Sequence, residues 1–263
     1  MSLSLHCRRL GRGPRDALAV HCSLAHGEAF APLAAHLPML SLHAPDLPGH
    51  GRSPGMPEGQ DYHRAATAAL RALPEAEGSL LIGHSLGATL ALRMALERES
   101  PPETLVLIEP VLFAAAAATA PELLQSEHAD AVRIGRAFEA GETEAVAREF
   151  TARWGDGRPW ESLPREARAR FTAQIPLIAA TDPALRLDNG NLLAPGRLEG
   201  LTSRVLLIRG SESPPIVAAI HAALLARLPQ ARERVVEGAG HMAPVTHAAE
   251  VAEAIASELA LIA

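Results

Sequence analysis

One serine stands in a local pattern that suits nucleophilic chemistry. Residues 83–87 read G-H-S-L-G, after the apolar run SLLI and before the helical pattern LGATLALRMALERE (86–99). A tight turn between a strand and a helix holds its central residue in a strained backbone conformation and presents the side chain above the sheet edge. The two glycines lack a Cβ, so strand and helix can pass close on either side. The pattern predicts that Ser85 is a nucleophile.

A serine hydroxyl is a poor nucleophile until a base accepts its proton. The chain has 12 histidines, and His241 follows the Gly-rich segment G-A-G (238–240), directly after the last predicted strand. A loop at that place would carry His241 over the sheet edge toward Ser85. His84 is adjacent to the nucleophile, but its side chain should point away from that of Ser85. We therefore predict that His241 is the general base.

The elements that must position these residues alternate along the chain. Short apolar runs predict strands, and the segments between them carry helical patterns. Strands are expected at 17–23, 39–46, 79–85, 104–109, 204–210 and 232–238, and helices near 28–36, 61–73, 86–99, 215–228 and 246–261. Strands separated by helices of this length indicate an α/β fold with a mostly parallel sheet covered on both faces.

The stretch 111–200 interrupts this alternation. It has no strand pattern, is rich in Ala, Glu and Arg, and carries expected breaks at Pro121, Gly141, Pro159, Pro164 and Pro176. We interpret it as a helical lid inserted into a core formed by residues 1–110 and 201–263. Such an insertion at the carboxyl end of a parallel sheet lies over the place where these folds bind ligands.

Two further segments carry a family resemblance. Residues 46–53 read D-L-P-G-H-G-R-S, and residues 238–241 read G-A-G-H. With the turn around Ser85, their order and spacing resemble the α/β-hydrolase superfamily, in particular its branch of small-molecule esterases, lactonases and carbon–carbon-bond hydrolases. The resemblance spans nearly the whole chain. It implies a Ser–His–acid site, with the loop 46–53 in a structural role.

The acid of that site departs from the family pattern. It should accept the second imidazole N–H and stabilise the imidazolium. The family usually places it three residues past a glycine that ends the strand before the last, where this chain has Ser213. Glu109 ends the strand 104–109, and certain dehalogenases and lipases of the family are similar in placing the acid after that strand. Glu212 lies one residue early. We predict Glu109, with Glu212 as the alternative.

The resemblance also implies an oxyanion hole made of two backbone N–H groups. One belongs to Leu86, directly after the nucleophile, and the other to the loop after the strand 17–23. The family usually has His-Gly-x there, whereas this chain has His21-Cys22-Ser23. Ser23 is expected to supply the second N–H, and Cys22 in place of glycine leaves the geometry of that loop open.

Candidate substrate contacts come from the insertion and from the neighbours of the site. Aromatic residues make up only 3% of the chain, yet Phe113, Trp154 and Trp160 all lie in the insertion. They are expected either to pack the lid helices or to form an apolar wall over the nucleophile. Met242, next to the base, and His26, near the oxyanion loop, complete this set.

Composition and charge exclude several classes of binding partner. A net charge of -6 argues against nucleic acid and against an anionic membrane surface. No apolar run reaches the roughly 18 residues of a spanning helix, and the N-terminus lacks the apolar stretch of a signal peptide. Cys7 and Cys22 show no pairing pattern, and Cys22 with His26 has no further metal ligand at useful spacing. We expect a cytoplasmic protein without metal, cofactor or stable membrane association.

These inferences converge on a serine hydrolase that cleaves a small or medium-sized, apolar, ester-like substrate through an acyl-enzyme on Ser85. The alternatives use the same scaffold. A carbon–carbon-bond hydrolase, a lyase or an acyltransferase would use the same three side chains, and a small-ligand receptor would use the pocket alone. The sequence carries no signal for the natural substrate or for the oligomeric state.

Overall fold

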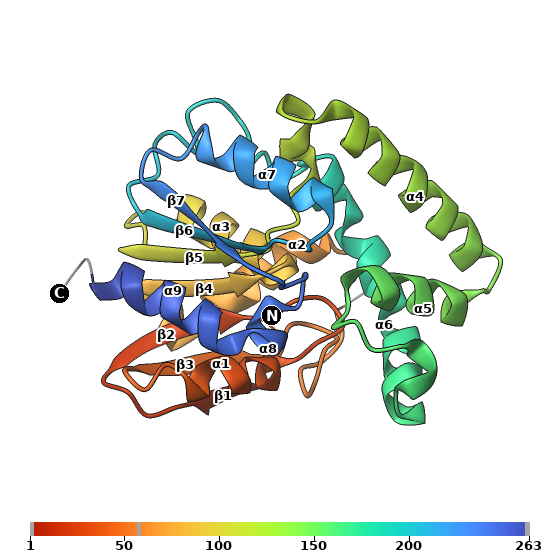
Figure 1. The fold of residues 1–263 in the computed structure, drawn as a ribbon, viewed down its shortest axis with the longest axis horizontal. Coiled ribbons are helices and arrows are strands. Elements are labelled where there is room, and N and C mark those ends of the chain that lie inside the picture. The colour runs from red at the N-terminus through yellow and green to blue at the C-terminus, as the bar shows by residue number, and fades with distance from the viewer. Residues whose placement is uncertain (1–2, 57–58, 261–263) are drawn as a thin grey trace.

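A seven-stranded sheet forms the centre of the computed structural model, which describes residues 3–56 and 59–260 (Figure 1). The strand order is β1-β3-β2-β4-β5-β6-β7. The edge strand β1 runs antiparallel to β3, and every other pairing is parallel. The strands are β1 (Cys7–Leu10), β2 (Arg15–Val20), β3 (Leu40–Pro45), β4 (Leu80–His84), β5 (Thr104–Ile108), β6 (Arg204–Gly210) and β7 (Ala231–Val236).

The central strands are apolar on both sides because helices cover both faces of the sheet. Every residue of β4 and β5 is buried. Side chains alternate between the two faces, so Leu80 and Ile82 join one hydrophobic cluster and Leu81 joins the other. The predicted α/β class with a mostly parallel sheet is confirmed.

Two helical layers enclose the sheet. The first cluster joins one face of the sheet to three helices, and the second joins the other face to two. The helices of the first layer are α2 (Tyr62–Arg71), α3 (Leu86–Glu97) and α7 (Pro215–Leu225), and those of the second are α1 (Ala31–Ala35) and α9 (Ala248–Ala260). The short helix α8 (Ala243–Thr246) precedes α9.

Some elements differ from the prediction. Strand β1 was not expected, because its Cys-Arg-Arg-Leu sequence lacks an apolar run; as an edge strand it is only half-buried. The helix expected near 28–36 is a 3₁₀ turn at Gly27–Phe30 followed by α1. The last helix is divided into α8 and α9 at His247, and its expected end at residue 261 lies outside the described residues.

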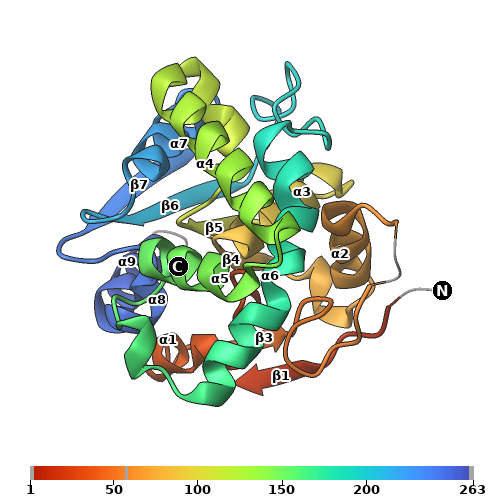
Figure 2. The same cartoon turned by 90° about the vertical axis from the view of Figure 1, so that its right-hand side faces the viewer.

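The insertion between β5 and β6 is helical. Its helices are α4 (Pro121–Glu139), α5 (Thr143–Trp154) and α6 (Arg165–Arg186). They lie together beside the sheet in Figure 1 and in front of it in Figure 2. Gly141 and Pro159 separate the helices and Pro164 precedes α6, as expected, but Pro176 does not break α6. A proline removes one backbone hydrogen bond, and a long packed helix tolerates that loss.

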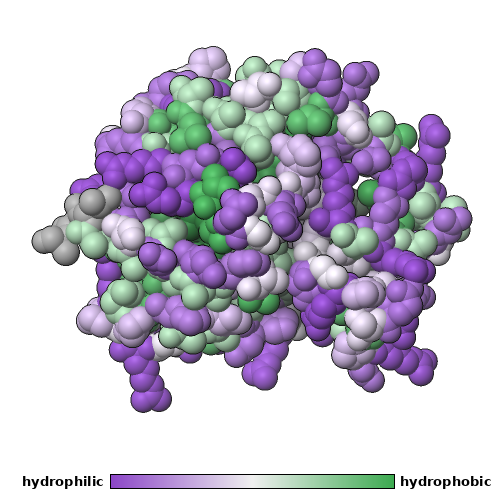
Figure 3. Space-filling model, in the orientation of Figure 1, coloured by the Kyte–Doolittle hydropathy of each residue, from purple (hydrophilic) through white to green (hydrophobic). Residues whose placement is uncertain are grey.

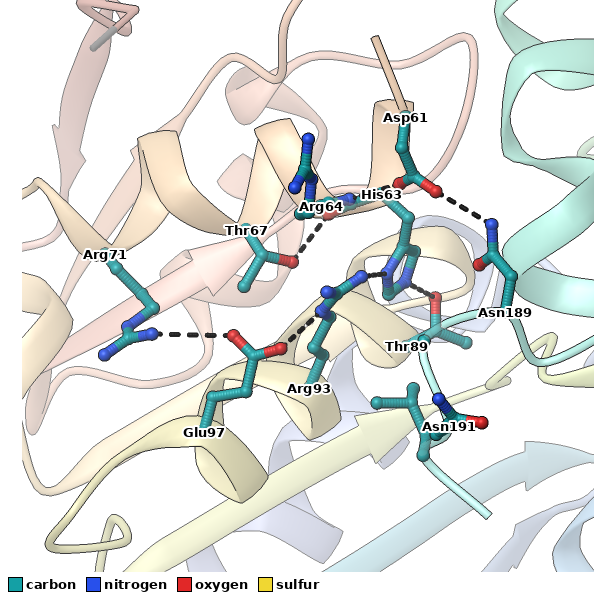
Figure 4. Close-up of polar contacts among 12 residues, drawn as sticks. Asp61, His63, Arg64, Thr67, Arg71, Thr89, Arg93, Glu97, Asn189 and Asn191 are labelled. Carbon is teal, nitrogen blue, oxygen red and sulfur yellow. Dashed lines mark hydrogen bonds and ion pairs between the residues drawn. The ribbon is translucent and has the colours of Figure 1, made fainter. Parts of the chain in front are cut away.

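A polar cluster fastens the end of the insertion to the core (Figure 4). Asn189, just after α6, donates to the Asp61 carboxylate that caps α2. The neighbouring His63 ring accepts from Arg93 of α3 and contacts the Thr89 hydroxyl through its other nitrogen. The Thr89 hydroxyl donates to a carbonyl in the first turn of α3. These contacts tie the chain just after α6 to α2, and α2 to α3, the helix that follows the predicted nucleophile.

One face of the molecule mixes hydrophilic and hydrophobic side chains (Figure 3). Figure 3 shows hydrophobic side chains in small patches scattered among hydrophilic ones. Among the described residues, no helix combines the length and the apolar character needed to cross a membrane.

Candidate active site

The turn between β4 and α3 places Ser85 in a backbone conformation that L-residues rarely adopt, with φ of 56°. Both flanking glycines are required by close backbone contacts. A Cβ on Gly83 would lie 2.3 Å from the carbonyl oxygen of Gly87, and one on Gly87 would lie 2.0 Å from that of Val20. The Ser85 N–H donates to Ile108 of the adjacent strand at 2.8 Å, which fixes the turn against the sheet.

His241 and Glu109 complete a hydrogen-bonded line with Ser85. His241 Nε2 lies 2.9 Å from Ser85 Oγ, and His241 Nδ1 lies 2.9 Å from Glu109 Oε2. All three residues are buried. A carboxylate accepts the Nδ1 hydrogen and so leaves the Nε2 lone pair free to accept the hydroxyl proton. The arrangement suits proton transfer from Ser85 to His241.

Glu109 directly follows β5 and has a φ of 53°. Its Oε1 accepts from the Gly210 N–H and the Ser213 hydroxyl, both at 2.6 Å. Burial alone would raise the pKa of Glu109, but the hydrogen bonds from His241, Ser213 and Gly210 outweigh it and hold that pKa below its ordinary value. Glu212, the alternative, is exposed, and among the described residues it forms no hydrogen bond or ion pair with His241. The structure therefore brings Glu109 to the site, with Ser213 as its hydroxyl donor.

The two predicted oxyanion donors are free. Among the described residues, neither the Ser23 nor the Leu86 backbone N–H has a hydrogen-bond acceptor. Leu86 is the first residue of α3, so its N–H lies at the positive end of the helix dipole. Cys22 is buried with its Sγ 4.0 Å from Met242 Sδ, and burial raises its pKa to about 12. Its thiol is therefore a neutral packing group rather than a reactive one.

Two buried histidines support the oxyanion loop, and sequence reasoning missed both roles. His21 Nδ1 donates to the Cys22 carbonyl at 2.7 Å, and its Nε2 accepts from Leu47 at 2.9 Å. His50 Nε2 accepts from the Leu24 N–H at 3.2 Å. Burial lowers the pKa of His21 to about 3 and that of His50 to about 4, so both rings stay neutral. The loop 46–53 thus acts as a scaffold for the loop after β2.

His84 also has a role that its sequence position did not reveal. Its Nε2 lies 2.8 Å from the His241 carbonyl oxygen. Burial lowers the pKa of His84 to about 3, so the neutral ring donates this hydrogen bond. The ring centroids of His84 and His241 lie 5.3 Å apart. His84 therefore holds the backbone of the predicted base.

A cavity of about 240 Å³ opens onto Ser85 and His241 beneath the insertion. Phe113 and Trp154 line it. The Trp154 and His241 rings form a T-shaped contact with their centroids 4.7 Å apart. The Trp154 and Phe113 rings form another, with their centroids 6.0 Å apart. Further apolar lining comes mainly from the insertion helices and includes Ile134, Phe138, Val146, Phe150, Ile175 and Ile178.

Three predicted contacts lie elsewhere. His26 and Met242 line a second cavity of about 360 Å³, which shares Ser23 and Trp154 with the first. Trp160 lines neither cavity. It is buried in a small hydrophobic cluster that joins the insertion helices to Leu24 of the loop after β2. Within residues 3–56 and 59–260, no group of three or more His, Cys, Asp or Glu side chains is arranged to hold a metal ion.

Comparison with known proteins shows the family of this chain. Residues 17–254 match the model of the alpha/beta hydrolase family. The chain belongs to the alpha/beta hydrolase family. Lipase LipV of Mycobacterium tuberculosis is 31% identical to this hydrolase over 98% of the chain and 99% of the lipase. A pimeloyl-[acyl-carrier protein] methyl ester esterase of Xanthomonas campestris pv. campestris is 30% identical over 95% of the chain and 97% of the esterase.

Solved structures show the same fold at low sequence identity. A thermophilic esterase from Thermogutta terrifontis superposes on this hydrolase with a TM-score of 0.72 at 20% identity, over 98% of the chain and 93% of the esterase. A hydrolase from Pseudomonas aeruginosa gives a TM-score of 0.71 at 21% identity, over 97% and 94%. The predicted family resemblance and fold are confirmed.

Proposed function

We propose that this chain is a serine hydrolase that cleaves small or medium-sized, largely apolar esters through an acyl-enzyme on Ser85. The observation that carries the proposal is the unbroken hydrogen-bonded line from Ser85 through His241 to Glu109, at the floor of an apolar cavity. Two of the relatives, a lipase and a methyl ester esterase, bear names for ester-cleaving enzymes and support the same class of reaction.

The proposed reaction has two half-reactions. Ser85 Oγ attacks the ester carbonyl carbon while His241 Nε2 takes its proton, and the Ser23 and Leu86 N–H groups stabilise the developing oxyanion. The carbon–oxygen bond to the alcohol then breaks as His241 returns the proton to the leaving oxygen. Water, activated by the same base, attacks the acyl-enzyme and releases the acid and free Ser85.

The test is a series of p-nitrophenyl esters from acetate to laurate, with fluorophosphonate labelling of the active-site serine. The wild type should hydrolyse the short and middle members and become labelled at Ser85. We expect Ser85→Ala to lose at least about 10³-fold in kcat/KM and all labelling. Ser162→Ala changes an exposed serine and should behave like the wild type.

The outcomes separate the competing classes. If no ester is hydrolysed and Ser85 is not labelled, the proposal fails. Stoichiometric binding of the same esters without turnover would instead indicate a small-ligand receptor. Transfer of the acyl group to an added alcohol in preference to water would indicate an acyltransferase.

A further inference from the structure

The cavity above Ser85 is apolar for most of its wall, but one cationic side chain in it has hydrogen-bond donors without acceptors. Arg186, at the end of α6, lines the cavity and its side chain is only 12% exposed. Its Nε donates to Asp182 at 2.7 Å. In the part of the chain that the structure describes, neither terminal nitrogen of this guanidinium has a hydrogen-bond acceptor, and Nη1 is buried. Buried guanidinium donors are normally paired.

A run of aromatic contacts fixes the place of Arg186 relative to the chemistry. The guanidinium lies over the Phe113 ring, 4.4 Å from its centroid. Phe113 contacts Trp154, which contacts the predicted base His241. Arg186 is therefore linked to the predicted base through Phe113 and Trp154, and it lines the same cavity as Ser85.

The charges around Arg186 decide which kind of oxygen group could bind to its guanidinium. Asp182 already compensates its positive charge. Glu127, which lines the same cavity, is buried and paired with Arg153, and Arg153 also binds Asp130 at 2.9 Å. Burial raises the pKa of Glu127 despite that pairing, so this end of the cavity disfavours additional negative charge. A neutral oxygen can accept a hydrogen bond from the guanidinium without adding negative charge to the cavity.

We infer that the substrate's acyl chain carries a neutral oxygen acceptor, such as a keto or amide carbonyl, at its far end, and that Arg186 binds this group. The inference rests on the proposed ester hydrolysis and names its substrate class. A purely aliphatic chain would leave the Arg186 donors unpaired, whereas a carbonyl would satisfy them. A cavity wall that donates to a substrate oxygen discriminates against the analogue that lacks it.

The test compares p-nitrophenyl alkanoates with their (ω−1)-oxo counterparts and with half-esters that end in a carboxylate, over a range of chain lengths. For at least one length, the wild type should favour the oxo ester over the alkanoate by about tenfold in kcat/KM, mainly through KM. Arg186→Met keeps an unbranched side chain against Phe113 and should abolish this preference while still hydrolysing the alkanoates. Arg186→Gln, which retains one N–H donor group, should keep part of it.

Arg170→Met is the matched control. Arg170 also lies over a phenylalanine, Phe171, at 5.2 Å, but both line the second cavity rather than the first. This variant should keep the wild-type preference. Alkanoate hydrolysis without any oxo preference in the wild type, or an unchanged preference in Arg186→Met, would overturn the inference and leave the proposed function intact. A strongest preference for the carboxylate esters would overturn the neutral assignment, and no hydrolysis of any ester would overturn both.

Discussion

Glu109 lies against the Nδ1 side of the His241 ring, and its proposed role as the acid can be tested at the scale of single residues. Replacing Glu109 by Gln puts an amide N–H against His241 Nδ1 and favours the imidazole tautomer that cannot accept the Ser85 proton. We expect kcat to fall on the order of 10³-fold or more with little change in KM. The measurement is steady-state hydrolysis of a short p-nitrophenyl ester.

The matched control is Glu212→Gln, which removes the same charge from an exposed side chain near the site. It should retain wild-type kcat. A large loss in this variant together with a near-normal Glu109→Gln would assign the acid to Glu212 instead.

His84 offers a second prediction of this kind. His84→Ala removes the only side-chain donor to the buried His241 carbonyl among the described residues, so the loop that carries the base loosens. We expect kcat to fall by about tenfold or more while KM for a plain ester stays within about twofold. His84→Gln places an amide N–H near the same carbonyl and should recover much of the loss. Equal activity of the Ala and Gln variants would argue against positioning through this hydrogen bond.

Sequence reasoning reached some site residues and not others for a physical reason. Ser85 lies in a turn whose requirements are local, so five consecutive residues were enough to indicate it. The supporting role of His84 depends on a contact with a residue 157 positions away. The role of His50 depends on a backbone group 26 positions away. No local pattern marks such contacts, although the unusual number of histidines near the motifs was a visible hint.

At the scale of elements, the effect of packing on stability can be compared directly at two glycines that lie in helices. Gly87 lies in the first turn of α3 against β2, where an added Cβ meets backbone atoms at 2.0 Å. Gly135 lies within α4, where an added Cβ meets nothing within 4 Å. Gly87→Ala should lower the free energy of unfolding by about 3 kcal/mol or more, or prevent folding. Gly135→Ala should raise it by about 0.5–1 kcal/mol.

Urea denaturation followed by far-UV circular dichroism measures both variants. The expected signs are opposite, although the two substitutions are chemically identical. A Gly87→Ala protein as stable as the wild type would mean that strand and helix are less closely packed than the structure indicates.

The accuracy of the element predictions follows from burial. Strands β4 and β5 are buried on both faces, so uninterrupted apolar runs indicated them directly. Strand β1 lies at the sheet edge and carries Arg8 and Arg9, so no apolar run distinguished it from a loop. Pro176 was expected to end a helix, but tertiary packing of α6 overrides that local preference.

At the scale of the whole molecule, buried neutral histidines link stability to pH. Burial lowers the pKa of His21 and His84 to about 3, and that of His50 and His63 to about 4, from an ordinary 6.5. Between pH 6.5 and 5, the unfolded chain therefore binds protons that the folded chain does not. The free energy of unfolding should fall as pH falls, by up to about 1.4 kcal/mol per pH unit for each histidine.

Urea unfolding at a series of pH values measures this slope. His63→Gln removes one of the four groups and should give a shallower slope than the wild type. His36→Gln changes an exposed side chain and is expected to keep the wild-type slope. A free energy of unfolding that stays constant over this pH range would contradict the prediction.

The junction at Glu109 has a consequence for protein engineering. The predicted acid is the first residue after β5, where the chain leaves the sheet for the insertion, and the insertion returns Trp154 to the edge of the His241 ring. The insertion therefore cannot be exchanged as an independent module. A chimera with another enzyme's cap would have to keep both Glu109 and an aromatic side chain at the position of Trp154, because the graft boundary runs through the proposed active site.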